Sequence, residues 1–154
     1  MIERKRVKRT RGGRFLIRIP VEERDVLRHL PGQLQELLAT DDPSLRRLFP
    51  PAYLDDEEKE AEYQGLMRED LLARHQAALA ILAETIDADE VDEEQLTAWM
   101  AALNELRLVL GTRLDVTEDF EDGLDPDDPL APAFGLYIYL GWLQEQVVAA
   151  LANW

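Results

Sequence analysis

Cysteine is missing from this 154-residue sequence, and its absence removes several kinds of chemistry at once. Without a thiol the chain can form no disulfide, supply no thiolate nucleophile or metal ligand, and respond to oxidants through no thiol switch. Serine is almost absent too, because Ser44 is the only one and no histidine lies next to it in the sequence. The sequence therefore gives no indication of the nucleophile and base that many hydrolases use.

Motifs for cofactors and metals are missing as well. The sequence has no glycine-rich phosphate loop, no Glu-x-x-His pair for a di-iron centre and no zinc-ligand spacing. Asp25 and His29 lie one helical turn apart, but no third ligand accompanies them, so we interpret them as a surface pair. Carboxylates gather in acidic runs rather than in apolar pockets that would raise a pKa. We therefore expect a protein without catalytic residues, cofactors or metals, and not an enzyme.

No hydrophobic run is long enough to span a membrane. The most apolar stretch, residues 130–143, has 14 residues before Gln144-Glu145-Gln146 interrupts it, whereas a spanning helix needs about 20. The basic residues at the N-terminus lead into no apolar segment of a signal peptide, so we expect a cytoplasmic protein. The length predicts a single domain over residues 1–154.

Charge is distributed very unevenly along the chain. Residues 1–18 hold eight Lys or Arg and one Glu, a net charge of +7. The other residues hold 9 basic and 31 acidic side chains, a net charge of −22. A basic arm is typical of contact with nucleic acid or with an acidic protein surface, whereas an acidic body repels DNA elsewhere.

The basic segment predicts a β-hairpin arm over residues 1–19, ahead of a helical bundle over 20–154. Gly12-Gly13 would form the tight turn with positive φ at both positions. Phe15, Ile17 and Ile19 alternate with other residues, so one face can rest on the body while the arginines face water. In one hypothesis the arm binds DNA phosphates or an acidic partner; in the other its arginines only screen the acidic helices. The candidate binding residues are Arg4, Lys5, Arg6, Lys8, Arg9, Arg11 and Arg14.

The rest of the chain predicts an all-α fold, a bundle of four to five helices behind the N-terminal β-hairpin. We expect a helix over 21–38 that Pro31-Gly32 splits, followed by helices over 44–49, 57–86, 92–111 and 133–154, with 87–91 as an acidic linker. Asp92 and Gln95 form a capping-box pattern, and Gly111 would end the central helix as its left-handed residue. Its apolar face comprises Leu96, Trp99, Met100, Leu103, Leu106 and Leu110.

Two polar residues lie at the edge of the predicted core. His75 lies on the apolar stripe of its helix, and we expect it to rest against a carbonyl or carboxylate, with a buried sensor as the alternative. Arg107 borders the core, and we expect it to pair with an acid such as Glu105 or one from the long helix, with an anion site formed with Arg113 as the alternative. The last helix is apolar on almost every face, which indicates an inner helix or a homodimer interface. The aromatic residues assigned to the core or to that interface are Trp99, Tyr139, Trp142 and Trp154.

Several stretches together resemble one actinobacterial family, the AosR-like proteins (domain of unknown function 2017). They are DPSLRRLFPPAY (42–53), WMAALNELRLVLGTRLDV (99–116), DDPL (127–130) and YIYLGWLQEQVVAAL (137–151). The resemblance implies a cytoplasmic, mostly helical regulator of oxidative-stress transcription that works with a sigma factor or RNA polymerase. It also implies a link to Clp-type proteolysis, since members are typically encoded beside a Clp-protease adaptor. One departure matters: redox sensing in the family is attributed to a cysteine pair, and this chain has none.

Two hypotheses of function follow. In the first, the chain is a non-catalytic regulator without a thiol switch: its basic arm contacts DNA phosphates or an acidic partner, and its acidic body binds the transcription machinery. In the second, it is an acidic protein-interaction adaptor linked to Clp-type proteolysis that never binds DNA. Neither includes a membrane. Salt dependence separates them, because contacts between several arginines and phosphates weaken steeply with added salt.

Overall fold

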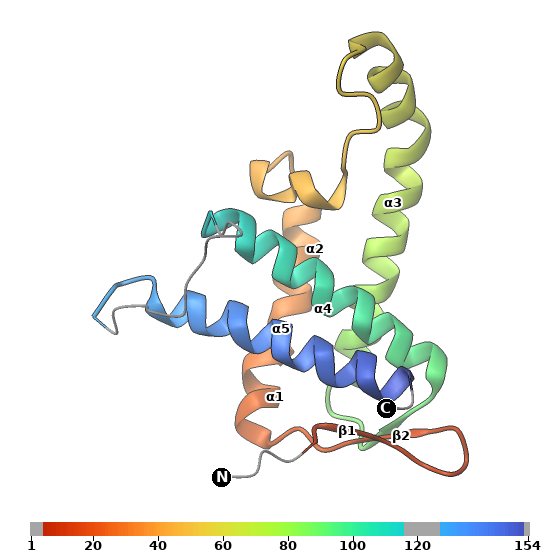
Figure 1. The fold of residues 1–154 in the computed structure, drawn as a ribbon, viewed down its shortest axis with the longest axis vertical. Coiled ribbons are helices and arrows are strands. Elements are labelled where there is room, and N and C mark those ends of the chain that lie inside the picture. Colours follow the sequence, from red (N-terminus) through yellow and green to blue (C-terminus); the bar gives the residue numbers. More distant parts are fainter. Residues whose placement is uncertain (1–4, 116–126, 153–154) are drawn as a thin grey trace.

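Helices make up most of the computed structural model, which describes residues 5–115 and 127–152. The predicted all-α fold with an N-terminal β-hairpin is confirmed (Figure 1). In chain order the elements are β1 (Val7–Arg9), β2 (Phe15–Ile17), α1 (Val21–Arg28), α2 (Leu30–Leu38), the 3-10 helix η1 (Pro43–Leu48), α3 (Glu57–Thr85), β3 (Glu90–Val91), α4 (Glu93–Arg113) and α5 (Ala131–Leu151).

The central helix α4 packs against α3, α5 and η1 and carries much of the core. Its capping box is present, because the Gln95 amide donates to Asp92 Oδ1 (2.7 Å) and the Asp92 amide donates to Gln95 Oε1 (2.9 Å). Trp99 is fully buried, and its indole Nε1 donates to Thr85 Oγ1 of α3 at 2.6 Å. The assignment of Trp99 to the core is confirmed, with its polar atom satisfied by a neighbouring helix.

Gly111 does not end α4, contrary to the prediction. The helix continues to Arg113, and the left-handed residue beyond it is Asp115, with φ of 54°. Gly111 instead lies against Tyr137 of α5, where a Cβ atom would come within 2.8 Å of the ring atom Cε1. The glycine therefore permits the close approach of α4 and α5.

The hairpin belongs to a three-stranded antiparallel sheet in the order β1-β2-β3. Val7 pairs with Ile17 and Arg9 with Phe15, and Phe15 pairs in turn with Val91, so the segment predicted to be a linker supplies a third strand. Of the two turn glycines only Gly13 has a positive φ, of 75°. The turn is wider than a two-residue hairpin turn, because the Thr10 amide donates to Arg14 O across it. The prediction of positive φ at both glycines was wrong.

Buried Arg24 joins this sheet to the helices, although nothing in the sequence pattern singled it out. Its guanidinium donates to the carbonyls of Ile17 (3.0 Å), Ile19 (2.8 Å), Ile86 (3.2 Å) and Ala88 (2.9 Å). These four acceptors come from the end of β2 and from the segment between α3 and β3. One side chain therefore satisfies main-chain acceptors of two segments that are distant in the sequence.

The remaining helices largely follow their sequence signals. The helix predicted over 21–38 is split at His29 into α1 and α2, with Pro31 in the first turn of α2, as expected. Asp56 caps α3 by accepting from the Lys59 amide at 3.1 Å. The N-terminal part of α3 extends away from the other elements (Figure 1), and Leu66 on it is 80% exposed. Within the described residues no helix is both long enough and apolar enough to cross a membrane.

The role of Arg24 predicts a large effect on stability. Arg24→Met should lower the free energy of unfolding by about 3 kcal/mol, because it leaves several buried carbonyls without a donor. The matched control Arg47→Met changes an exposed arginine and should stay within about 0.5 kcal/mol. Urea denaturation followed by circular dichroism measures both, and equal effects of the two substitutions would contradict this role of Arg24.

Candidate functional site

Most of the cations that the sequence marked as candidates are exposed on and around the hairpin. Lys5, Lys8, Arg11 and Arg14 are exposed, as is Arg18 just beyond β2. Arg14 pairs with Glu90 of β3 at 3.0 Å, whereas Lys5, Lys8 and Arg11 form no ion pair with any described residue. Arg4 lies outside the described part of the chain. This exposed cationic surface (Lys5, Lys8, Arg11, Arg14 and Arg18) is called the basic face below.

Arg6 does not face water; it binds the helices instead. Its Nε and Nη2 donate to Glu23 Oε1 (3.0 Å) and Oε2 (2.8 Å) in a bidentate pair, and its guanidinium lies 5.0 Å from the centre of the Trp142 ring. Tyr139 Oη also donates to Glu23 Oε1, at 2.7 Å. The hydrogen bond from Arg6 is the main cause of the lowered pKa of Glu23, and burial is the main cause of the raised pKa of Tyr139. Arg6, Glu23, Tyr139 and Trp142 thus form one contact between hairpin, α1 and α5.

Arg9 fixes the other side of the hairpin. It donates to the carbonyls of Ala150 (3.2 Å) and Leu151 (2.8 Å), in the last turn of α5. Both carbonyls lie at the negative end of the dipole of α5, where a cation is favourable. Figure 1 shows the hairpin beside the C-terminal end of α5. Of the seven candidate residues, Arg6 and Arg9 therefore hold the arm on the body, and the expectation that all the arginines face water was wrong.

The candidate aromatic residues are placed differently from one another. Trp99 is in the core, while Tyr139 and Trp142 are half-buried and in contact with each other at 6.0 Å between ring centres. Trp154 lies outside the described residues. Because Tyr139 and Trp142 pack against Arg6 and Glu23 of the same chain, the fold accounts for part of their burial. A homodimer interface there stays a prediction.

His75 rests against both a carboxylate and a carbonyl, as expected. Its Nδ1 lies 2.7 Å from Glu105 Oε1 of α4, and its Nε2 lies 2.9 Å from the Leu48 carbonyl of η1. Both ring nitrogens thus face an oxygen that can accept a hydrogen bond. The two hydrogen bonds together require two protons, one on Nε2 and one between Nδ1 and Glu105 Oε1. Burial by itself would lower the pKa of His75, but the bonds to Glu105 and Leu48 outweigh it and raise that pKa above 6.5.

Glu105 is a buried carboxylate that the sequence analysis did not expect. It is 5% exposed, burial raises its pKa, and its Oε2 has no hydrogen-bond partner among the described residues. It faces His75, so the expected pairing with Arg107 was wrong; Arg107 donates to Asn104 Oδ1 (3.3 Å) and Tyr137 Oη (3.4 Å). Glu105 is an acid in an apolar setting, but it lines neither cavity described for this part of the chain.

Metal ligands do not gather anywhere in residues 5–115 and 127–152, where no group of three or more suitable side chains occurs. Asp25 pairs with Arg28 at 2.6 Å rather than with His29. The surface built most specifically is the basic face, because Arg6, Arg9 and Arg24 fix its orientation on the helices.

Comparison with known proteins points to one family. The family model described as a domain of unknown function (DUF2017) matches residues 4–151. The putative oxidative stress regulator AosR of Mycobacterium leprae is 29% identical, over 96% of this chain and 87% of that protein. The oxidative stress regulators AosR of Mycobacterium bovis and Mycobacterium tuberculosis are each 32% identical, over 71% of this chain and 58% of those proteins. No solved structure matches the chain significantly.

The His75–Glu105 pair predicts a pH dependence of stability. Both groups have raised pKa values in the folded state, so the folded chain holds protons that the unfolded chain releases first. The contribution of Glu105 is present in full below its ordinary pKa of 4.5 and is lost as pH rises through its raised pKa. The contribution of His75 is present in full below its ordinary pKa of 6.5 and is lost as pH rises through its own raised pKa. The free energy of unfolding should therefore fall as pH rises above 4.5, and continue to fall above 6.5.

Urea denaturation at several pH values measures this slope. In the double variant His75→Gln/Glu105→Gln the slope should largely vanish, because neither group titrates. The control His29→Gln removes an exposed histidine and should keep the slope of the unaltered chain. An unchanged slope in the double variant would contradict the assignment.

Proposed function

Because the chain belongs to the DUF2017 family, we propose that it is a non-catalytic regulator of the oxidative stress response that acts by contact with the transcription machinery. The family match covers residues 4–151, and the resemblance to AosR-like proteins is thereby confirmed. The curated relatives are named as oxidative stress regulators and not as enzymes. Their names support the regulatory role, and the contacts below are our proposal.

The single observation that carries the proposal is that the hairpin is docked while several of its cations stay exposed. Arg6 and Arg9 dock the hairpin on α1 and α5, whereas Lys8, Arg11 and Arg18 remain exposed. In a chain of net charge −15, exposed cations gathered on a docked sheet are well suited to an acidic partner.

The partner we favour is an acidic surface of a sigma factor or of RNA polymerase rather than DNA. DNA is a long, uniform negative rod, and the remaining residues of the chain carry a net charge of −22 that would repel it beyond a short contact. A compact acidic protein surface matches the small area of the basic face better. Contact with DNA phosphates beside such a partner is compatible with the proposal.

The opposite end of the molecule favours a second candidate function, an adaptor linked to Clp-type proteolysis. Leu54 and Leu66 are 84% and 80% exposed, and Tyr53 is 45% exposed, next to the acidic first turn of α3. Exposed apolar side chains among acids are typical of a surface that binds a basic partner. In this alternative the basic face plays no part in binding.

Charge reversal tests the leading proposal. Lys8→Glu/Arg11→Glu should weaken binding to an actinobacterial RNA polymerase holoenzyme by at least about tenfold at low salt, because like charges then face each other. The matched control Arg46→Glu/Arg47→Glu makes the same change of net charge at two exposed arginines of η1 and should bind within about twofold of the unaltered chain.

Surface plasmon resonance with core enzyme, holoenzyme and free sigma factor measures these affinities and identifies the subunit. Equal weakening by both double variants would show that the change of net charge alone causes the loss of affinity. Retention of RNA polymerase binding by the basic-face variant would reject the leading proposal.

The absence of cysteine yields a separate prediction. Diamide oxidises thiols, so diamide and dithiothreitol should leave the affinity for the partner unchanged, within about twofold. Binding titrations with and without each reagent measure this. This chain and its partner are treated separately, and the reagent is removed before they are mixed. A diamide effect that arises from treatment of this chain alone would contradict the account.

A further inference from the structure

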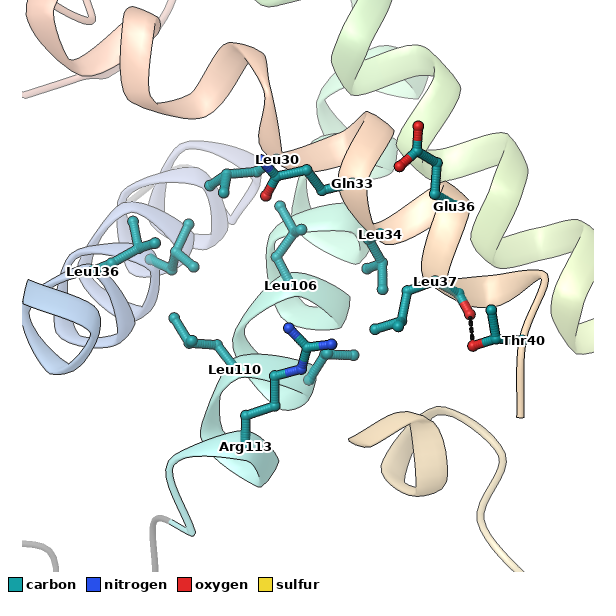
Figure 2. A pocket seen from close by; sticks show the side chains of 12 residues that line it. Leu30, Gln33, Leu34, Glu36, Leu37, Thr40, Leu106, Leu110, Arg113 and Leu136 are labelled. Carbon is teal, nitrogen blue, oxygen red and sulfur yellow. Dashed lines mark hydrogen bonds between the residues drawn. The ribbon is translucent and has the colours of Figure 1, made fainter. Parts of the chain in front are cut away.

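An open apolar groove lies between α2, α4 and α5, away from the basic face. Its volume is about 390 Å³. Of the residues that line it, Leu34 and Leu140 are buried, whereas Leu30, Leu37 and Leu136 are only half-buried. Figure 2 shows Leu30, Leu34, Leu37 and Leu136 around this space. This volume falls within the range of roughly 300–1,000 Å³ that is usual for small-molecule sites.

The lining gives this groove a chemical preference. Its apolar residues are all leucine or valine, so aliphatic carbon would fill it, at a gain of about 25 cal/mol for each Å² of apolar surface removed from water. The space is small for a partner helix, which is about 10 Å wide with its side chains. A single flexible hydrocarbon chain matches the space better.

One cation lines the groove among these leucines. Arg113, in the last turn of α4, directs its guanidinium toward the space between Leu110 and Leu37, whereas the Glu36 carboxylate points away from the leucines (Figure 2). The protein contacts of Arg113 are long: Nη2 is 3.7 Å from Asp42 Oδ2, and Nε donates to Ser44 Oγ at 3.3 Å. Its side chain is 53% exposed, so its guanidinium retains N–H donors for a second acceptor.

We propose that this groove binds a small amphiphilic carboxylate, with its aliphatic chain on the leucines and its carboxylate on Arg113. An arginine can hold a carboxylate through two parallel hydrogen bonds, which a nearby Asp42 at 3.7 Å does not form. The ligand therefore competes with Asp42 for the same cation. The site is separate from the basic face and does not depend on the proposed contact with the transcription machinery.

Two probes of the same chain length and opposite charge test the charge preference. Decanoate should bind the full chain with a stoichiometry of one, and decyltrimethylammonium should bind at least about tenfold more weakly. Isothermal titration calorimetry below the micelle concentration of each probe measures both affinities. Equal binding of the two probes, or no binding of decanoate, would overturn the proposal.

Substitutions then locate the site. Arg113→Gln should weaken decanoate binding by about fivefold to tenfold, and the control Arg47→Gln should leave it unchanged. Asp42→Asn keeps a good capping residue for η1 but removes the competing charge, so it should strengthen binding by about twofold to threefold. Leu110→Trp should fill the groove and abolish binding.

Thermal unfolding of each variant establishes that it is folded before its affinity is compared. If Arg113→Gln and Asp42→Asn bind decanoate as the unaltered chain does, the assignment to this groove is wrong. Chemical-shift changes induced by decanoate should likewise fall on Leu30, Leu110 and Leu136. Changes confined to the exposed end of α3 would instead place the amphiphile on that surface and overturn the proposal.

Discussion

The arrangement of sheet and helices depends on the buried guanidinium of Arg24. It donates to carbonyls at the end of β2 and in the segment between α3 and β3, and the carboxylate of Asp89 is 3.9 Å away on a side chain that is 98% exposed. Hydrogen bonds to main-chain acceptors, rather than a salt bridge, therefore compensate the burial of this charge. Arg6 and Arg9 likewise join the hairpin to the helices. Arg6 pairs with Glu23 of α1, and Arg9 donates to the last carbonyls of α5.

Because these arginines bind the body of the protein, the basic N-terminal segment is not simply a cationic tail. Within one short segment, some cations hold the hairpin on the body and others remain exposed, so the segment is a docked sheet rather than a tethered tail. A docked surface loses little conformational entropy when it binds, which favours specific contact over a diffuse attraction to any polyanion. The missing thiols fit such a mechanism, since recognition by a fixed surface requires no covalent change.

Local features were predictable, and long-range ones were not. The capping box of Asp92 and the burial of Trp99 follow from residues three or four positions apart. A glycine such as Gly111 is typical of a helix end. Its role here is to allow the close approach of Tyr137 from another helix, which no local pattern reveals. Arg6, Arg9 and Arg24 look like other surface arginines in the sequence, because their acceptors are main-chain carbonyls or distant carboxylates. Similarly, Glu105 is buried because α3 and η1 cover it, and only the fold brings His75 beside it.

Native-state hydrogen exchange tests most directly whether the hairpin is fixed. The Ile17 amide donates to Asp89 O (2.8 Å) and reports on the docking of the hairpin, whereas the Arg18 amide donates to Arg6 O (2.8 Å) and reports on pairing within the hairpin. If the basic residues act as a fixed surface, these amides should open with nearly the free energy of the buried core of α4 around Leu103. Exchange of both amides at a much lower free energy, while α4 stays protected, would show that the hairpin detaches as an independent arm and would contradict the account.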